Sequence, residues 1–509
     1  MLAKIVDRGL DIVERVGNRL PDPVTIFIIL TLGILVISGI FSWVGVGAIH
    51  PANQGPVLVT NLLSKDYFQR IFTEMTMNFA NFPPLGMVLV TVIGIGVAER
   101  SGLIDTALKK FVTAVPPSAL TATLVFGGIT SSMAADAGYI VLTPLGAVLF
   151  AGFGRHPLAG LAAAFAGVSA GFSANLLLTS LDPLLSGLST TSAQIIDPNY
   201  IVHPTANYYF MVVSTFILTF VGTIITDKIV EPRLGEWDPK SLGVQISDSS
   251  NNQLKAISSE QSKGLVVAAI VFILSLILVA VMSIPENGLL RGAEGSLDPF
   301  YGSLVPLIMF LFLFCGLSYG VVAGTIKSDK DAVGMTNEYM ATMGGYIILS
   351  FVAAQFVTLF NWSNMGLVIA IKGANFLEWI GLTGIPLMIG FMFVTGTINI
   401  FIGSASAKWA IMGPVFIPMF MLMGFSPEVV QNVYRVGDSV TNIISPLLPY
   451  FPIIIAFAKK YDPKIGIGTL ISTMLPYSIA FGLTWSIMLG IWLLTGMPLG
   501  PDAPAFYSP

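Results

Sequence analysis

Long apolar segments recur along the whole chain and constrain its fold more than any other feature. A membrane-spanning helix needs about 20 mostly apolar residues. Only 10% of the 509 residues are charged and 54% are hydrophobic, whereas a soluble domain carries about 25% charged residues. The sequence therefore predicts an all-α polytopic membrane protein. Its nine predicted spans are 24–46, 79–98, 157–186, 207–226, 265–284, 303–322, 338–379, 428–458 and 466–497.

Two further apolar stretches, 118–150 and 385–424, are rich in Gly, Ser and Ala and predict re-entrant helical hairpins. The placement of Lys and Arg sets orientation, because these residues favour cytoplasmic segments. With two hairpins and a cytoplasmic N-terminus, 18 of the 24 Lys and Arg residues lie inside and 3 lie outside. If 118–150 were a single span, the polar stretch 227–264 would lie outside. We therefore predict that hairpin one opens to the cytoplasm and hairpin two to the exterior.

An internal repeat relates the two hairpin regions. Gly102 matches Gly381, and five further matches recur at a constant separation of 270 residues. Because the first copy starts outside and the second starts inside, the copies are predicted to be inverted, a recurrent plan of secondary transporters. The five matches are Pro144 with Pro414, Gly154 with Gly424, Pro157 with Pro427, Gly167 with Gly437, and Ser169 with Ser439.

The spans and the repeat divide the chain into six predicted segments. Two precede the first repeat: an amphipathic cytoplasmic segment at 1–23, and the first span with an external loop at 24–77. The others are the first inverted repeat with hairpin one (78–186), connecting spans with the cytoplasmic loop 227–264 (187–356), the second inverted repeat with hairpin two (357–458), and the last span with an external C-terminus (459–509).

Each copy contains an Asn-bearing interruption that ends in proline. The first reads GFSANLLLTSLDP (171–183) and the second GDSVTNIISP (437–446). A break in mid-membrane frees backbone carbonyls and helix termini, which bind cations and anions respectively. Ser and Asn can instead merely tie helices together, but two repeat-related sets favour a binding site. The candidate cation-binding residues are Ser173, Asn175, Asn399 and Asn442.

Ionisable side chains inside the apolar segments sharpen this prediction, because they are costly in a membrane and mark functional sites. Arg435 and Asp438 are three residues apart, so on a helix they share a face, and we expect them to pair. An inert internal salt bridge is the alternative. The ionisable residues in apolar segments are Asp136, Asp182, Lys408, Arg435 and Asp438.

Two other candidate site residues also have a purely structural interpretation. Asp182 lies beside a predicted break, where it could instead cap a helix. Trp409 lies in hairpin two, where it either stacks on an aromatic substrate or packs between the hairpin arms.

Several functional classes find no support in the sequence. There is no basic stripe for nucleic acid, no GxxxxGK[ST] sequence for ATP, and no HExxH motif or Cys/His cluster for a catalytic metal. Neither Asp182 nor Asp438 lies in a protease-type motif, and no selectivity-filter sequence is repeated. The sequence therefore predicts neither an enzyme nor a channel, and no cofactor. It predicts transport coupled to a gradient of H⁺ or Na⁺.

Long segments of the chain resemble the p-aminobenzoyl-glutamate transporter (AbgT) family. They include GRHPLAGLAAAFAGVSAGFSANLLL, IGSASAKWAIMGPVFIPMFMLMG and YRVGDSVTNIISP, and the resemblance runs from about residue 15 to 509. The chain looks closer to the sulfonamide and antimetabolite exporters of the family than to its folate-catabolite importer. The resemblance implies an inner-membrane homodimer whose protomers each have nine spans, two hairpins, a scaffold and a transport core.

The resemblance also implies which residues take part in transport. The positively charged side chain of Lys408 either alters the affinity for an anionic substrate or simply faces an interface between helices. The family positions implicated in transport fall on Asp182, Asn399, Ser406, Trp409, Pro427, Arg435, Asp438 and Pro446.

Together these observations predict a secondary active transporter of p-aminobenzoyl-glutamate-like folate metabolites or sulfonamide antimetabolites, working by proton-coupled efflux. The alternative is sodium-coupled uptake of dicarboxylates or of p-aminobenzoyl-glutamate. The expected partners are a small aromatic carboxylate or sulfonamide, the lipid bilayer and a second copy of the chain.

Overall fold

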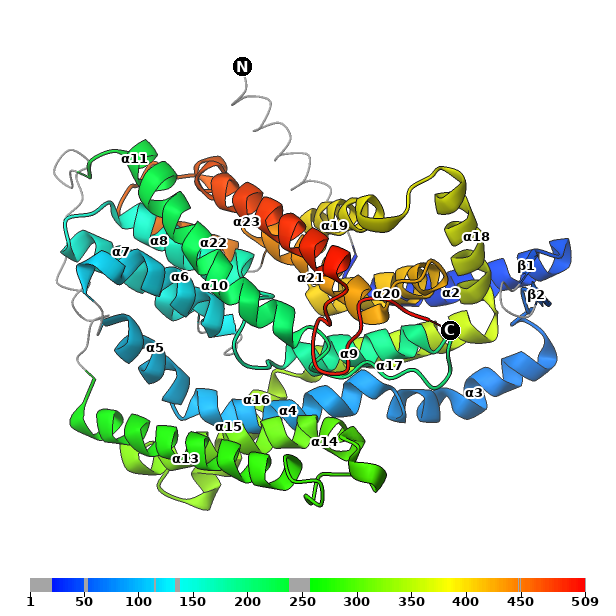
Figure 1. Cartoon of the computed structure of the whole chain (residues 1–509), viewed down its shortest axis with the longest axis horizontal. Coiled ribbons are helices and arrows are strands. Elements are labelled where there is room, and N and C mark those ends of the chain that lie inside the picture. Colours follow the sequence, from blue (N-terminus) through cyan, green and yellow to red (C-terminus); the bar gives the residue numbers. More distant parts are fainter. Residues whose placement is uncertain are drawn as a thin grey trace.

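The computed structural model describes residues 21–49, 54–113, 116–132, 138–237, 257–446, 448 and 450–508. Within these ranges the chain is almost entirely helical (Figure 1). One small antiparallel sheet pairs β1 (Gly47–Ile49) with β2 (Pro56–Leu58), placing Gly47 opposite Leu58.

Nine helical segments of the described ranges are long and apolar enough to cross a membrane, which confirms the predicted membrane fold. They include the two arms of predicted hairpin two, α19 and α20. They are α2 (Pro23–Val44), α3 with α4 (Lys65–Ala80 and Pro83–Arg100), α10 with η5 and α11 (Tyr208–Ile225, Thr226–Val230 and Glu231–Leu234), α13 (Ser259–Ser283), α15 (Leu304–Ala323), α17 (Gly344–Trp362), α19 (Gly384–Phe401), α20 (Ala405–Leu422) and α23 (Ile467–Thr495).

The remaining helices are shorter, and several of them belong to the two repeats. They are α5 (Leu103–Thr113), η1 (Pro117–Ala119), α6 (Leu120–Ser131), η3 (Gly138–Leu142), α7 (Thr143–Gly152), α8 (Pro157–Phe165), η4 (Ala166–Ala170), α9 (Leu181–Ala193), η6 (Ala293–Gly295), α14 (Asp298–Gly302), α16 (Asp329–Ala341), α18 (Met365–Trp379), α21 (Pro427–Asn442) and α22 (Phe451–Lys459).

The helices form two groups by their contacts, and the division into a scaffold and a transport core stays a prediction. In one group α4 packs against α15 and α16, α15 packs against α13, and α17 packs against α2 and α3. In the other, α6, α7 and α8 pack together and α21 packs against α19, α20 and α23. Helix α9 joins the groups because it contacts both α4 and α20, and it lies near the centre of the molecule (Figure 1).

Three of the predicted spans are interrupted rather than continuous. The predicted span 338–379 is divided between α16, α17 and α18, because α17 ends at Trp362 and α18 begins at Met365. The other two are the spans that contain the sequence breaks. In the first copy, α8 and η4 end at Ala170 and α9 begins only at Leu181. In the second copy, α21 ends at Asn442 and α22 begins at Phe451. Both interruptions fall at the sequence breaks, where Asn and Pro disfavour a continuous helix.

The predicted loops are also shorter than expected. The helix that includes α10 continues to Leu234, and α13 begins at Ser259 after a capping box formed by Ser258 and Gln261. Residues 227–234 and 259–264 of the predicted loop 227–264 are therefore helical, and its residues 238–256 lie outside the described ranges. The predicted external loop of 24–77 contains helix α3, which leads directly into α4.

The two repeat copies share local geometry at the matched glycines. Gly102 and Gly381 have φ angles of 87° and 70°, and Gly154 and Gly424 have φ angles of 71° and 86°. Such angles favour glycine because a Cβ atom would clash with the backbone. The re-entrant character of both hairpins remains a prediction.

A second matched pair shows the same close helix contact in both copies. A Cβ atom at Gly167 would lie 2.4 Å from the carbonyl oxygen of Val125 in α6. A Cβ atom at Gly437 would lie 2.5 Å from the carbonyl oxygen of Met392 in α19. In each copy, therefore, the helix after the hairpin packs with its backbone against the hairpin's first arm.

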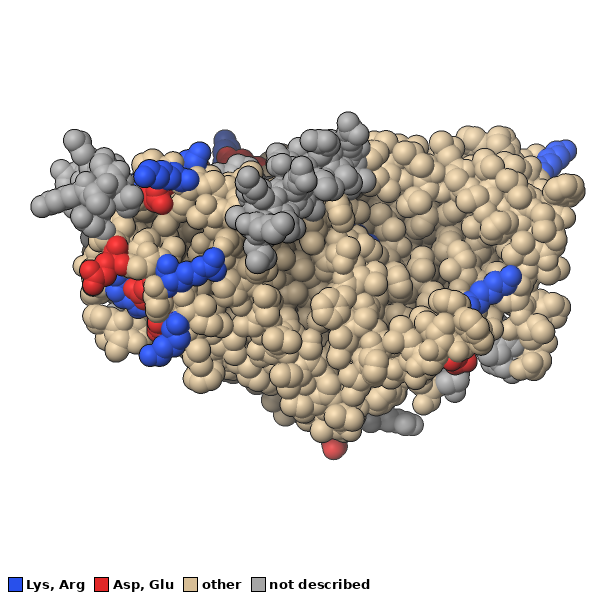
Figure 2. Space-filling view, turned by 90° about the horizontal axis from the view of Figure 1, so that it is seen from above, with Lys and Arg blue, Asp and Glu red and all other residues tan. Residues whose placement is uncertain are grey.

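Charged residues gather mainly at one end of the visible face in Figure 2, and a broad uncharged surface extends from there toward the other end. Helix α11 lies at that end of the molecule in Figure 1, and it carries Glu231 and Arg233. Lipid can cover an uncharged face at no electrostatic cost, so this distribution suits a membrane protein.

Small residues allow α4 and α15 to cross closely, and this contact predicts a sensitive position. A Cβ atom at Gly94 would lie 2.0 Å from the carbonyl oxygen of Met309, so Gly94→Ala must push the helices apart. We expect a loss of about 1–3 kcal/mol, measured as a lower melting temperature of the purified protein in detergent. Gly86→Ala is the control, because the same helix leaves open space there. Equal melting temperatures for the two variants would contradict this packing.

Candidate functional site

Two buried ion pairs lie where the breaks of both copies meet hairpin two. Arg435 of α21 donates from Nη1 to Oδ1 of Asp182, at the start of α9, over 2.6 Å. Lys408 of α20 donates from Nζ to Oδ1 of Asp438, one turn further along α21. All four side chains are at most 3% exposed. An unpaired charge is costly at such a buried place, so each residue of a pair lowers the free-energy cost of burying the other.

The predicted pair of Arg435 with Asp438 is wrong. The two residues do lie on α21, as the spacing requires, but each side chain reaches a different neighbouring helix. Arg435 reaches α9 of the first copy, and Asp438 reaches α20 of the second. Tertiary packing decides the partners, because both residues are surrounded by other elements rather than exposed on one free helix face.

The Lys408 ammonium group donates to two side-chain oxygen atoms. Besides Asp438, it donates to Oδ1 of Asn399 near the end of α19. The Asn399 amide nitrogen donates in turn to the Asp438 carbonyl (2.8 Å), Thr441 Oγ1 (2.9 Å) and Asn442 Oδ1 (2.8 Å). These bonds therefore tie both arms of hairpin two to the C-terminal part of α21.

The first pair leaves a donor unused. Asp182 accepts from the Thr179 backbone N–H (2.6 Å) and hydroxyl (3.0 Å) through Oδ2, so it organises the turn before α9 as well as binding Arg435. Asp182 is the second residue of α9 and its N-cap is Ser180, so the capping alternative is wrong, whereas the role of Asp182 in transport stays a prediction. The Nε–H of Arg435 is buried and has no partner among the described residues. A buried donor without an acceptor is costly, and an acceptor from a ligand would remove that cost.

Trp409 packs between helices in this structure. Its ring is completely buried and stacks on Tyr434 of α21, with centroids 4.4 Å apart and planes inclined by 29°. Its indole N–H donates to Ser189 of α9 over 2.9 Å. Trp409 is therefore packed against α21 and α9, and its stacking on an aromatic substrate stays a prediction.

Ser and Asn of the two breaks join the copies to each other. Ser439 donates to Ser173 over 2.7 Å, and the Asn442 amide donates to the Ser169 carbonyl over 3.4 Å. Asn175 lies apart from these contacts and donates to Ser132 at the end of α6 over 2.9 Å. The four candidate cation-binding residues are therefore buried but divided between two places, and the described residues contain no cluster of three or more acidic, His or Cys side chains that could hold a metal ion.

The remaining candidates border these contacts or lie elsewhere. Ser406 is half-buried and hydrogen bonds to Ser404, the N-cap of α20. Pro427 is the first residue of α21, where a missing N–H costs nothing. Pro446 lies in the break after α21. Asp136 lies outside the described residues.

Sequence reasoning missed a buried polar chain that continues from Trp409. Ser189 donates to Gln431 over 2.7 Å, and the Gln431 amide donates to Asn207 over 2.9 Å. The Asn207 amide donates to the carbonyl of Glu428 over 2.8 Å, and Tyr200 donates to the Glu428 carboxylate over 2.9 Å. The signal was available, because α21 carries many polar residues in a segment that has to be buried.

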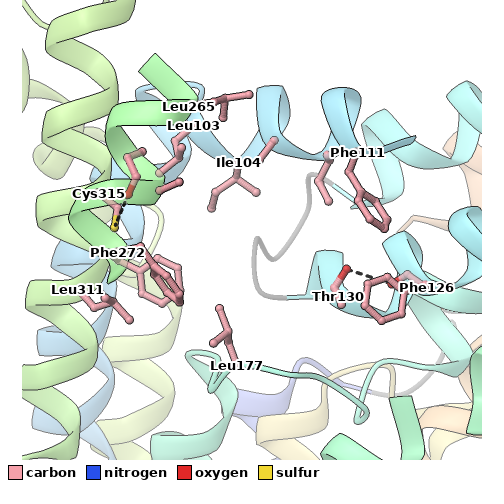
Figure 3. A pocket seen from close by; sticks show the side chains of 15 residues that line it. Leu103, Ile104, Phe111, Phe126, Thr130, Leu177, Leu265, Phe272, Leu311 and Cys315 are labelled. Atoms are coloured by element: carbon pink, nitrogen blue, oxygen red, sulfur yellow. Dashed lines mark hydrogen bonds between the residues drawn. The ribbon is translucent and has the colours of Figure 1, made fainter. Parts of the chain in front are cut away.

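The larger of two cavities described here lies away from the charged residues. It has a volume of about 410 Å³ and lies between α5, α6, α13 and α15 (Figure 3). Its lining includes Phe111, Phe126, Phe272 and Cys315, with Thr130 as its only hydroxyl group. Thr130 donates to the Phe126 carbonyl over 3.0 Å. Nothing in this lining selects a charged substrate, so the ion pairs form the better candidate site.

Known proteins resemble the chain over almost its whole length. The model of the AbgT putative transporter family matches residues 8–507. The p-aminobenzoyl-glutamate transport protein of Escherichia coli K12 is 40% identical over 492 residues, which cover 96% of this chain and 95% of that protein.

Two solved structures have the same fold. The Neisseria gonorrhoeae protein MtrF, presented as representative of a class of antimetabolite efflux pumps, shares 45% identity with a TM-score of 0.91, covering 97% of this chain and 100% of its own. The Alcanivorax borkumensis YdaH transporter shares 42% identity with a TM-score of 0.89, covering 94% and 100%. The resemblance noted in the sequence is confirmed, and this multi-pass membrane protein belongs to the AbgT family of transporters.

Proposed function

We propose that the chain is a proton-driven secondary transporter that exports p-aminobenzoyl-glutamate-like metabolites and sulfonamide antimetabolites across the inner membrane. The observation that carries the proposal is the pair of buried ion pairs, one of which leaves the Arg435 Nε–H without a partner. The names of the E. coli relative and of MtrF support the substrate classes. An aromatic substrate that replaces Tyr434 as the stacking partner of Trp409 would lie beside the ion pairs.

Substrate and proton compete for the same carboxylate in this proposal. The aromatic amine of p-aminobenzoyl-glutamate and the NH₂ group of a sulfonamide are both hydrogen-bond donors. A carboxylate accepts from such a donor freely while ionised, and protonation turns it into a donor itself. Substrate bound to Asp182 or Asp438 therefore excludes the proton from that carboxylate. Such exclusion is what exchange of a proton for a substrate requires.

The Arg435 guanidinium supplies the complementary contact. Its unpartnered Nε–H offers a donor to a substrate carbonyl, carboxylate or sulfonyl oxygen without breaking the bond to Asp182. A hydrogen bond that involves a charged group contributes about 1.5–3 kcal/mol. Arg435 therefore serves as the main polar anchor of the substrate, while an ionised aspartate accepts from the amine.

The surroundings of Lys408 favour protons over sodium as the coupling ion. Its ammonium group lies between Asn399 and Asp438, where a bound Na⁺ would otherwise find oxygen ligands. The position for a cation is thus filled by a side chain of the protein. Sodium-coupled uptake is the second candidate, and it rests on the oxygen atoms of Ser173, Ser439 and Asn442 at the junction of the copies.

Transport is proposed to proceed in a homodimer whose scaffold stays fixed while the transport core moves, with the N-terminus in the cytoplasm. The division of the helices into two groups joined by α9 supports this arrangement. The cation bias toward predicted inside segments supports the orientation.

The direct test supplies one gradient at a time to the purified protein in liposomes. We expect a pH gradient to drive accumulation of p-aminobenzoyl-glutamate or sulfanilamide on the acidic side. A sodium gradient at equal pH should drive none, because Lys408 occupies the cation position. Flux is measured with radiolabelled substrate, and protein-free liposomes give the rate of passive permeation. Flux driven by sodium alone would instead support the second candidate.

Removing the charges of the Lys408–Asp438 pair should affect stability and transport differently. Lys408→Gln or Asp438→Asn alone leaves one buried charge unpaired and should lower the free energy of unfolding by about 3–5 kcal/mol. The double variant removes both charges, so we expect its stability to return while transport driven by a pH gradient stays lost. Stability is measured by thermal melting and transport as flux per folded protein.

A control pair distinguishes coupling from structure. Arg70 and Glu74 form an exposed pair in α3, so the double variant Arg70→Gln/Glu74→Gln should change neither stability nor flux appreciably. Normal gradient-driven flux in the Lys408→Gln/Asp438→Asn variant would mean that the buried pair is structural and does not couple transport to the proton gradient.

Arg435→Lys tests the substrate anchor. Lysine keeps the positive charge for Asp182 but lacks the Nε–H donor in its fixed plane. We expect the dissociation constant of p-aminobenzoyl-glutamate, measured by calorimetry in detergent, to rise about tenfold or more. Arg233→Lys, at an exposed arginine of α11, should leave it unchanged. If Arg435→Lys binds p-aminobenzoyl-glutamate with unchanged affinity, Arg435 does not contact the substrate.

A further inference from the structure

We propose that a groove between α19, α21 and α23 admits neutral aromatic molecules bearing N–H donors, such as sulfonamides, from the lipid toward Asn399. This inference rests on the proposed transport function and adds a second route for one of its substrate classes. The groove has a volume of about 340 Å³, which is within the ~300–1,000 Å³ of small-molecule sites.

The mouth of the groove opens on a surface that lipid would cover. Phe393 of α19 is 66% exposed, and Ile479 and Leu483 of α23 are 54% and 61% exposed. Both helices belong to the segments that are apolar and long enough to span a membrane. Large apolar side chains are exposed there because their solvent is the bilayer, so a molecule dissolved in lipid can reach the groove without crossing water.

Four hydroxyl groups line an otherwise apolar groove, and the hydrogens of three of them are already used. Thr397 donates to the Phe393 carbonyl (2.8 Å), Thr441 to the Gly437 carbonyl (2.9 Å) and Ser486 to the Gly482 carbonyl (2.7 Å). Each hydroxyl oxygen has a further lone pair. The groove therefore offers acceptors to a ligand, which fits an aromatic amine or sulfonamide NH₂ group.

The same lining disfavours charged substrates. No Lys, Arg or His side chain lines the groove, so a carboxylate entering it would lose water and gain no counter-ion. A plain acyl chain has no donor for the hydroxyl oxygens. The chemistry thus separates neutral sulfonamides, which suit the groove, from anionic p-aminobenzoyl-glutamate, which has to reach Arg435 by another route.

The groove leads to the candidate site through one hydrogen bond. Thr441 lines the groove and accepts from the amide of Asn399 over 2.9 Å, and Asn399 in turn accepts from Lys408. A ligand that reaches Thr441 is therefore one side chain away from the Lys408–Asp438 pair. The larger cavity in Figure 3 has no such link, because its single hydroxyl, that of Thr130, bonds only to carbonyls of α6 among the described residues and accepts from no side chain of the candidate site.

Gly482 provides a way to fill the groove without disturbing the fold. A Cβ atom at this position would meet only Val440 Cγ2, at 4.0 Å, so Gly482→Leu places its side chain in free space. Gly490 is a matched control on the same helix. It is also half-buried, has open space around a Cβ atom and does not line the groove.

The experiment uses 4-azidobenzenesulfonamide, a neutral photoreactive probe, on the full-length protein in liposomes. We expect light to attach it to peptides of α19 and α23, and excess sulfanilamide to suppress this labelling. Gly482→Leu should reduce labelling and sulfanilamide flux about tenfold, as expected when apolar contacts and acceptors are lost together. Its p-aminobenzoyl-glutamate flux should stay near wild type, and Gly490→Leu should change neither flux.

Three results would overturn the lateral route. Labelling that Gly482→Leu removes but sulfanilamide does not suppress would identify a groove filled by lipid. Labelling unaffected by Gly482→Leu would place the probe elsewhere. Equal loss of both fluxes in Gly482→Leu would mean that the substitution blocks the core itself. If the wild-type protein transports neither compound, the proposed function fails, whereas competition for labelling still decides whether the groove binds sulfonamides.

Discussion

Four charged side chains buried in a membrane protein are the constraint on which the central structure depends. Removing a charge from water without a partner is strongly unfavourable, so α9, α20 and α21 must be held where Arg435 meets Asp182 and Lys408 meets Asp438. One bond crosses from the first repeat to the second, and the other joins two elements of the second repeat. The pairs therefore fix the relative positions of the breaks and of hairpin two.

The broken helices give these charges their surroundings. A continuous helix would use all its own backbone groups, whereas each interruption leaves a turn that side chains have to satisfy. Asp182 binds the backbone of Thr179 in the first copy, and Asn399 binds the carbonyl of Asp438 in the second. Charge pairing and backbone satisfaction are thus performed by the same residues. Protonating or displacing one of them would affect both, which is a useful property for a transport site.

The two repeats are similar in backbone and different in chemistry. Gly167 and Gly437 allow the same close contact with the first arm of each hairpin. At the break, however, the first copy has Asp182 where the second has Ser445, which donates to carbonyls of α19. The backbones of the two repeats are therefore nearly symmetric, whereas the charged side chains that they hold are not. The groove next to Asn399 adds a further asymmetry, because it opens beside the second hairpin.

The sequence by itself determined the membrane fold, the position of both breaks and the residues of the candidate site, because apolar length, Gly and Pro placement and buried charge are properties of local sequence. It also paired glycines whose backbone angles prove equivalent. Only the tertiary structure decided the partner of Arg435, the two oxygen contacts of Lys408 and the stacking of Trp409. Helical spacing says which residues share a face, whereas packing decides which neighbouring helix meets this face. For Arg435 with Asp182 and for Trp409 with Ser189, the partners are more than 200 positions apart.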